Sequence, residues 1–133
     1  MKLRCYILLF LLVFYGYSSV AQRKFNGHFK NGNGKISFVL SADGKFVSQV
    51  IFSGVWRCGG GNEKITAGPD QTFAVTNGII KGFTVDPVNG GASAFRFDIQ
   101  GNVSDQLASG IFRMYIKGLA CDTYKLRWVA KSY

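Results

Sequence analysis

The sequence predicts an all-β protein, an antiparallel sandwich or closed barrel of about eight or nine strands formed by residues 22–133. Apolar and polar residues alternate with a period of two in most segments, and no segment has the 3.6-residue periodicity of a long helix. Turn residues separate these segments at short intervals, and 17 of the 133 residues are Gly. An open sheet of this many strands would leave one face and two edges bare, so we expect closure.

The composition excludes several classes of protein. With 47% hydrophobic and only 17% charged residues, the chain is too apolar to be a disordered tail. It is also too short for a (β/α)₈ barrel or a doubly wound nucleotide-binding fold, so one domain is expected.

Residues 1–21 are predicted to be a cleaved signal peptide. Lys2 and Arg4 precede an apolar run over residues 6–14, and Ser19 and Ala21 place small residues at positions −3 and −1 of a cut before Gln22. The alternative is an uncleaved anchor, but the apolar run is short for a membrane span. We therefore expect a secreted domain, periplasmic or extracellular, with no membrane span after cleavage.

Export gives the cysteines a simple role. Cleavage of the leader would remove Cys5 and leave Cys58 and Cys121. We expect these two to form one disulfide because oxidising compartments favour it. Closing so long a loop stabilises a fold by roughly 4 kcal/mol in the chain-entropy model. The bond also requires the end of one strand to lie near the start of another, as antiparallel neighbours or across the core.

The first three strands are predicted as a meander over residues 25–57. The Asn-Gly and Asp-Gly dipeptides at residues 31–34 and 43–44 tolerate positive φ and should each close a hairpin. The third strand, residues 45–57, is long, and Gly54 within it is expected to mark a bend or bulge.

The remaining strands follow between further turns. They are expected at residues 63–67, 72–75, 79–85, 95–100, 110–116 and 124–128. In the last segment Cys121 has the parity of Lys125 and Arg127, not that of Trp128. Either a bulge near residues 122–123 restores the register or Cys121 belongs to the loop, and we favour the loop.

Signatures of catalysis are weak. His28 is the single histidine and is expected to be an ordinary strand residue, and no Gly-x-Ser-x-Gly motif surrounds a serine. No cysteine and histidine spacing suits a metal, and no motif indicates a cofactor. Pairs of acids suited to glycoside cleavage could arise by chance. We expect no enzymatic activity; a small hydrolase is the least favoured alternative.

The basic excess is the most informative feature, with 16 Lys and Arg against 7 Asp and Glu. Several cations and one aromatic occupy the polar positions of the last strands and would stand side by side in a meander, with Asp98 as a partial counter-charge. This candidate binding face comprises Arg96, Arg113, Tyr115, Lys125 and Arg127. Such a face suits an anionic polymer, an acidic glycan or a lipid head group, with nucleic acid less favoured. The alternative interpretation is an ordinary solvated surface.

The spacing of turns, strands and cysteines resembles that of small secreted bacterial all-β domains of uncharacterised function, and the leader is similar to those of exported Bacteroidetes proteins. The residues that carry the resemblance are residues 34–41, Asp43-Gly44, Cys58, residues 110–113, Cys121 and Trp128. The resemblance implies residence in the cell envelope or outside the cell, and it assigns no functional residue.

These observations lead to two hypotheses. The first is an exported non-enzymatic domain that binds an anionic polymer, an acidic glycan or an envelope protein through its basic face. The alternative is a structural or accessory subunit of a cell-surface assembly, which would dock through exposed apolar surface.

Overall fold

The computed structural model describes residues 21–87 and 89–133. All of the predicted signal peptide except Ala21 lies outside the described residues. In the part that is described, no helix is long and apolar enough to cross a membrane.

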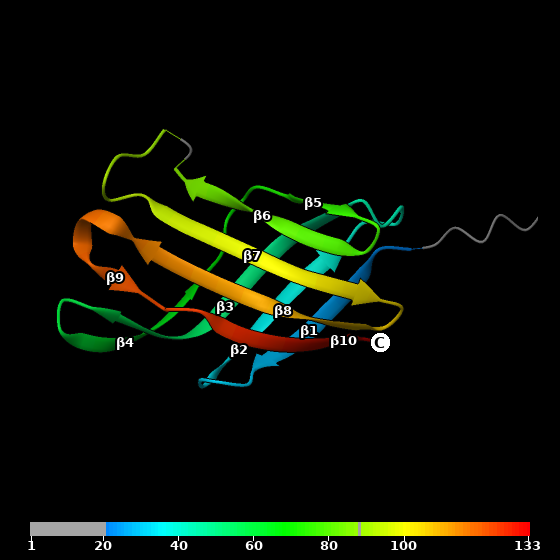
Figure 1. Cartoon of the computed structure of the whole chain (residues 1–133), viewed down its shortest axis with the longest axis horizontal. Helices are drawn as coiled ribbons and strands as arrows, with labels where there is room; N and C mark the ends of the chain where they lie inside the picture. The colour runs from blue at the N-terminus through cyan, green and yellow to red at the C-terminus, as the bar shows by residue number, and fades with distance from the viewer. Residues whose placement is uncertain (1–20, 88) are drawn as a thin grey trace, which may run out of the picture.

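The described residues form ten strands and one short 3₁₀ helix, which confirms the all-β prediction (Figure 1). The elements are β1 (Arg23–Phe29), β2 (Gly34–Leu40), β3 (Phe46–Cys58), β4 (Gly61–Ala67), β5 (Phe73–Thr76), β6 (Ile79–Asp86), β7 (Phe95–Ser104), β8 (Leu107–Ile116), η1 (Lys117–Leu119), β9 (Cys121–Asp122) and β10 (Leu126–Ser132). The two-residue strand β9 is the addition to the eight or nine strands expected from the sequence.

All strand pairs are antiparallel, and their hydrogen bonds run round the molecule as a flattened ring. β10 pairs with both β1 and β8, while β5 joins β3 to β6. The layer that contains β6, β7, β8 and β10 crosses the layer that contains β1, β2 and β3 at a steep angle (Figure 1). The fold is therefore a sandwich whose two layers are joined at the corners.

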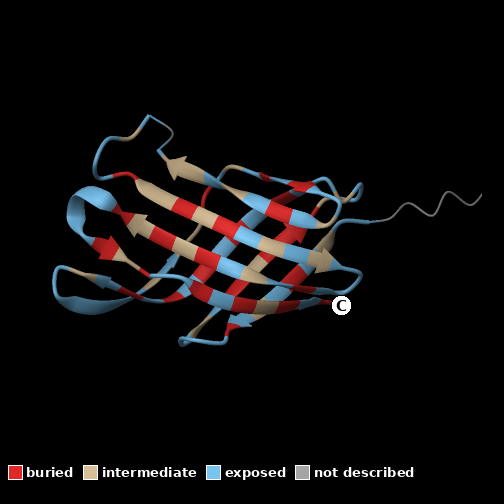
Figure 2. Ribbon diagram, in the orientation of Figure 1, coloured by how far each residue is buried: buried red, intermediate tan, exposed pale blue. Residues whose placement is uncertain are grey.

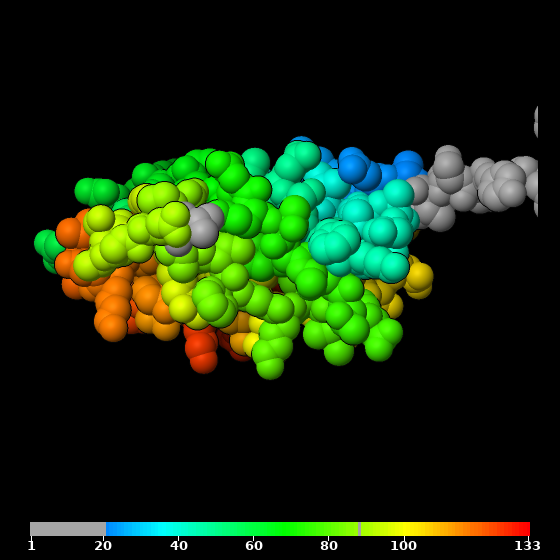
Figure 3. Space-filling view, turned by 90° about the horizontal axis from the view of Figure 1, so that it is seen from above, coloured from blue at the N-terminus to red at the C-terminus, as the bar shows by residue number. Residues whose placement is uncertain are grey.

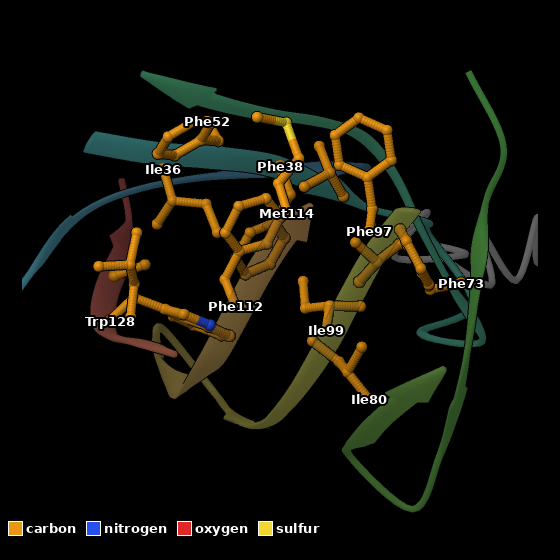
Figure 4. Packing of buried hydrophobic residues seen from close by; sticks show 14 of the residues in the cluster. Ile36, Phe38, Phe52, Phe73, Ile80, Phe97, Ile99, Phe112, Met114 and Trp128 are labelled. Carbon is orange, nitrogen blue, oxygen red and sulfur yellow. The ribbon is translucent and has the colours of Figure 1, made fainter. Parts of the chain in front are cut away.

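The inward-facing side chains of the strands fill the space between the layers. Buried and exposed residues alternate along the strands (Figure 2). At the centre the ring of Phe112 lies 5.3 Å from that of Phe52, 6.2 Å from Phe29 and 6.4 Å from Phe97, centroid to centroid. Aromatic side chains from both layers thus form one core (Figure 4).

The meander of β1, β2 and β3 is confirmed, but the predicted position of its irregularity is wrong. The register between β2 and β3 shifts between Ser37 and Val39, opposite Gln49, whose φ is 49°. Gly54 is regularly paired with Gly34 instead. A Cβ at Gly54 would lie 2.9 Å from the Phe52 ring, so glycine is needed there for close packing and not for a bulge.

The predicted disulfide is present between Cys58 and Cys121. It joins antiparallel neighbours, because Arg57 of β3 pairs with Asp122 of β9. The prediction that Cys121 lies in a loop is wrong, since Cys121 pairs with Ile116 of β8. The conflict of parity is resolved after β9, where the chain leaves the sheet and Tyr124 adopts a φ of 55°.

Two glycines allow close packing beside Trp128. Trp128 of β10 is opposite Gly110 of β8, and Gly110 is opposite Gly101 of β7. A Cβ on Gly101 would lie 2.6 Å from the Trp128 ring, and a Cβ on Gly110 would lie 1.9 Å from the carbonyl oxygen of Gln100. Gly101 thus leaves room for the indole of Trp128, and Gly110 allows β8 to approach the backbone of β7 closely.

Removing the disulfide is expected to destabilise the domain by about 4 kcal/mol, because the bond closes a loop with a sequence separation of 63. Urea denaturation of the C58A/C121A variant, compared with reduced and oxidised wild type, measures this loss. The reduced wild type should match the variant. A loss of less than about 1 kcal/mol in both would show that the ring is held without the covalent bond.

Phe112→Ala is expected to reduce the free energy of unfolding by about 3–5 kcal/mol, because the wholly buried ring contacts three others. Leu107→Ala on the same strand is the matched control, since Leu107 is 57% exposed. Its effect should stay within about 1 kcal/mol in the same denaturation experiment. Equal losses in the two variants would contradict the assignment of the core.

Candidate functional site

The register of β7 and β8 brings three of the predicted site residues together on the outer face. Arg96 is directly opposite Tyr115, and Asp98 is directly opposite Arg113. Residues directly opposite in an antiparallel pair have Cβ atoms about 5 Å apart. Arg96, Arg113 and Tyr115 are therefore neighbours, with Asp98 among them.

Aromatic rings and guanidinium groups alternate across this face. The Arg96 guanidinium carbon lies 3.9 Å from the centroid of the Phe83 ring and 5.9 Å from that of Tyr115. The Arg113 guanidinium carbon lies 4.4 Å from the Tyr115 centroid on its own side. We call the series Phe83, Arg96, Tyr115 and Arg113 the cation–π row. Stacking of this kind holds the arginine side chains against the sheet.

Each arginine of the cation–π row also binds a carboxylate. Arg96 Nε donates to Asp98 at 3.1 Å, and Arg113 Nε donates to Asp122 at 3.0 Å in a bidentate pair. The Asp122 side chain is only 16% exposed. Burial raises the pKa of Asp122, but the hydrogen bonds from Arg113 and from the Tyr124 backbone N–H outweigh it, so the pKa lies below its ordinary value. The same pair raises the pKa of Arg113.

The other two predicted cations, Lys125 and Arg127, are exposed beside the row. Arg127 is opposite Ile111 of β8, and Lys125 lies in the segment between β9 and β10. Asn31 fixes this segment, because its Nδ2 donates to the Lys125 carbonyl at 2.9 Å and its Oδ1 accepts from the Arg127 N–H at 2.6 Å. Among residues 21–87 and 89–133, neither cation forms an ion pair.

An open groove of ≈ 310 Å³ runs beside the cation–π row. Its lining combines an aromatic ring, an amide, a carboxylate and several cations. The lining includes Lys81, Phe83, Asp98, Gln100, Arg113 and Lys125. Phe83 is 57% exposed, so its ring is available to a ligand in spite of its contact with Arg96. This groove offers a stacking surface, hydrogen-bond acceptors and positive charge within one site.

Sequence reasoning missed several residues of this face. Phe83 and Lys81 share the outward parity of a strand that was predicted, so their alternation could have revealed them. Arg57 precedes Cys58, and Asp122 follows Cys121. The predicted disulfide therefore already implied that Arg57 and Asp122 lie close together. The ion pair of Asp122 with Arg113 has no signal in the sequence.

The remaining features of the described surface are its potential metal ligands and the single histidine. No three His, Cys, Asp or Glu side chains within 21–87 and 89–133 are placed to hold a metal ion. His28 is exposed on β1 and lines a different groove with Asn102 and Ser109. The outer face, by contrast, brings aromatic, cationic and carboxylate side chains together in one place.

Fold and site together define an antiparallel sandwich with one disulfide and a basic, aromatic outer face. Comparisons of the chain with protein-family models, curated proteins and solved structures gave no match.

Asp122→Asn is expected to destabilise the domain by about 1–3 kcal/mol at neutral pH, because it removes the charged partner of Arg113. The folded pKa of Asp122 is depressed, so the wild-type contribution is complete above the unfolded value of about 4 and is lost as the pH falls through the folded pKa. Denaturation curves at a series of pH values should therefore converge for wild type and variant in acid. A constant gap between them down to the lowest pH would contradict the pair.

Proposed function

We propose that this protein is an exported, non-enzymatic domain that binds an acidic polysaccharide on the outer face of β6, β7 and β8. The observation that carries the proposal is the cation–π row beside the groove. Phe83 and Tyr115 supply flat apolar faces, and Arg96 and Arg113 are held in place between carboxylates and rings. Residence outside the cytoplasm, which the leader and the disulfide favour, would expose this face to cell-envelope or extracellular glycans.

The chemistry of the face suits a sugar acid in three respects. An exposed ring such as Phe83 stacks against the C–H face of a sugar. Asp98 and Gln100 offer oxygens that accept hydrogen bonds from hydroxyl groups. Lys125 and Arg127 carry charge that no carboxylate of the described residues neutralises, and they can bind the acidic group of the sugar.

The balance of charge favours an acidic glycan over a nucleic acid. The face and its groove carry more cations than carboxylates, with a net charge of +3. The residues counted are Lys81, Arg96, Arg113, Lys125 and Arg127 against Asp98 and Asp122. The carboxylates set among the cations accept hydrogen bonds, which the many hydroxyl groups of a polysaccharide can donate, whereas the phosphates of a nucleic acid only accept them.

The alternative, an accessory subunit of a surface assembly, has weaker support. Phe46, Ile51 and Val55 are exposed on the outer face of β3, but Ser48 and Ser53 alternate with them. Single exposed apolar residues of this kind are normal on a monomer. The outer edge of β4 carries Glu63 and Lys64, and charge on an edge strand opposes pairing with another chain.

The test is binding of polygalacturonate, a carboxylated polysaccharide, with uncharged dextran as the comparison ligand. Calorimetric titration should show binding of polygalacturonate alone, and the affinity should fall steeply as salt is added. The K125Q/R127Q variant should bind about five- to tenfold more weakly, because it loses the two cations without an ion pair.

The matched control is K24Q/K35Q, which removes the same charge from exposed positions on β1 and β2. Its affinity should remain within about twofold of wild type. Equal weakening by both variants would mean that attraction depends on net charge alone. Binding of dextran as tightly as polygalacturonate, or of neither polymer, would overturn the proposal.

A further inference from the structure

One row of side chains crosses six strands without interruption. Val85 of β6 is opposite Arg96, Arg96 is opposite Tyr115, and Tyr115 is opposite Asp122 of β9. The row then continues into the other layer, where Asp122 is opposite Arg57 of β3 and Arg57 is opposite Asn62 of β4. At about 4.8 Å between strands, this cross-strand row spans about 24 Å.

A second groove of ≈ 410 Å³ lies at the far end of the cross-strand row, where β4 and β9 approach each other at one end of the molecule in both views (Figures 1 and 3). Tyr124 lines this groove with 56% of its surface exposed, and the Arg57 guanidinium carbon lies 5.5 Å from the centroid of the Tyr124 ring. The amides of Asn33 and Asn62 also line it.

The second groove repeats the chemistry of the first. Each is lined by an exposed aromatic ring that has a guanidinium group over it: Phe83 lies under Arg96, which is beside the first groove, and Tyr124 lies under Arg57, which lines the second. Each also has amide groups for sugar hydroxyls, and Lys125 lines both. Two like sites that share a cation are suited to two parts of one polymer.

The contacts between the two grooves fix their relative position. Asp122 accepts hydrogen bonds from Arg113, which lines the first groove, and from the N–H of Tyr124, which lines the second, at 2.7 Å. The disulfide between Cys58 and Cys121 joins the residues adjacent to Arg57 and Asp122. Asp122 therefore links Arg113 of the first groove to Tyr124 of the second, and fixing their relative position reduces the entropic cost of engaging both grooves.

We propose that a linear acidic polysaccharide lies across the strands from the groove beside the cation–π row to the second groove, with Tyr124 and Arg57 forming a second sugar-binding subsite. This inference rests on the proposed function, because the first subsite is the groove beside the cation–π row. The two grooves have separate linings apart from Lys125, so a ligand that fills both is a chain of at least two sugar units. Affinity should accordingly rise with chain length until both subsites are filled.

The experiment uses oligogalacturonates of increasing length, titrated into wild type and the Tyr124→Ala and Arg57→Gln variants. Wild-type affinity should increase from the shortest chains to those that reach both grooves and should then remain constant. Both variants should bind the shortest chains as wild type does, and they should bind the long chains about fivefold more weakly. Tyr133→Ala, at another exposed tyrosine, is the matched control and should behave as wild type. Circular dichroism and thermal unfolding establish that each variant is folded.

The outcomes separate this inference from the proposal on which it rests. If wild type binds short and long chains with equal affinity, or if both variants bind long chains as wild type does, the second subsite is refuted and the first groove still stands. If wild type binds no oligogalacturonate of any length, both proposals fail. Tighter binding of single-stranded DNA of matched charge would overturn the assignment of a glycan in both.

Discussion

The burial of aromatic side chains between two crossed layers of strands is the interaction on which the rest of the structure depends. Because side chains alternate along a strand, every ring that enters the core around Phe112 places its sequence neighbours on the outer face. Arg113 is outward for this reason, and the pairing of β7 with β8 then sets it opposite Asp98. The rows of charged and aromatic residues outside are thus a direct result of how the interior is filled.

Local patterns in the sequence predicted much of this fold. The alternation over residues 95–100 gave β7 and its inward face, and the Asn-Gly and Asp-Gly turns gave the meander of β1, β2 and β3. The bulge was expected at Gly54 but lies opposite Gln49, a non-glycine residue with a φ of 49°, and Gly54 serves close packing instead. The short strand β9 was missed because two residues carry no periodicity.

The candidate site was only partly predictable, for a physical reason. Parity within single strands identified Arg96, Arg113 and Tyr115, but it says nothing about which carboxylate each arginine binds. Those partners depend on register between strands, which long-range packing decides. The pairing of Arg57 with Asp122 connects residues far apart in the chain, and only the disulfide prediction contained that information. A charge that looks free in the sequence, such as Arg113, is therefore neutralised in the structure.

The position of β10 between β1 and β8 has a consequence for how the chain acquires its shape. β10 supplies Trp128 to the interior and pairs with the first strand, and its Arg127 is bound to Asn31, 96 residues earlier. The ring of paired strands therefore cannot close until β10 is available to pair with β1 and β8. Contacts between segments so far apart in the chain form slowly. During synthesis the ring would therefore stay open until residues 126–132 had emerged from the ribosome.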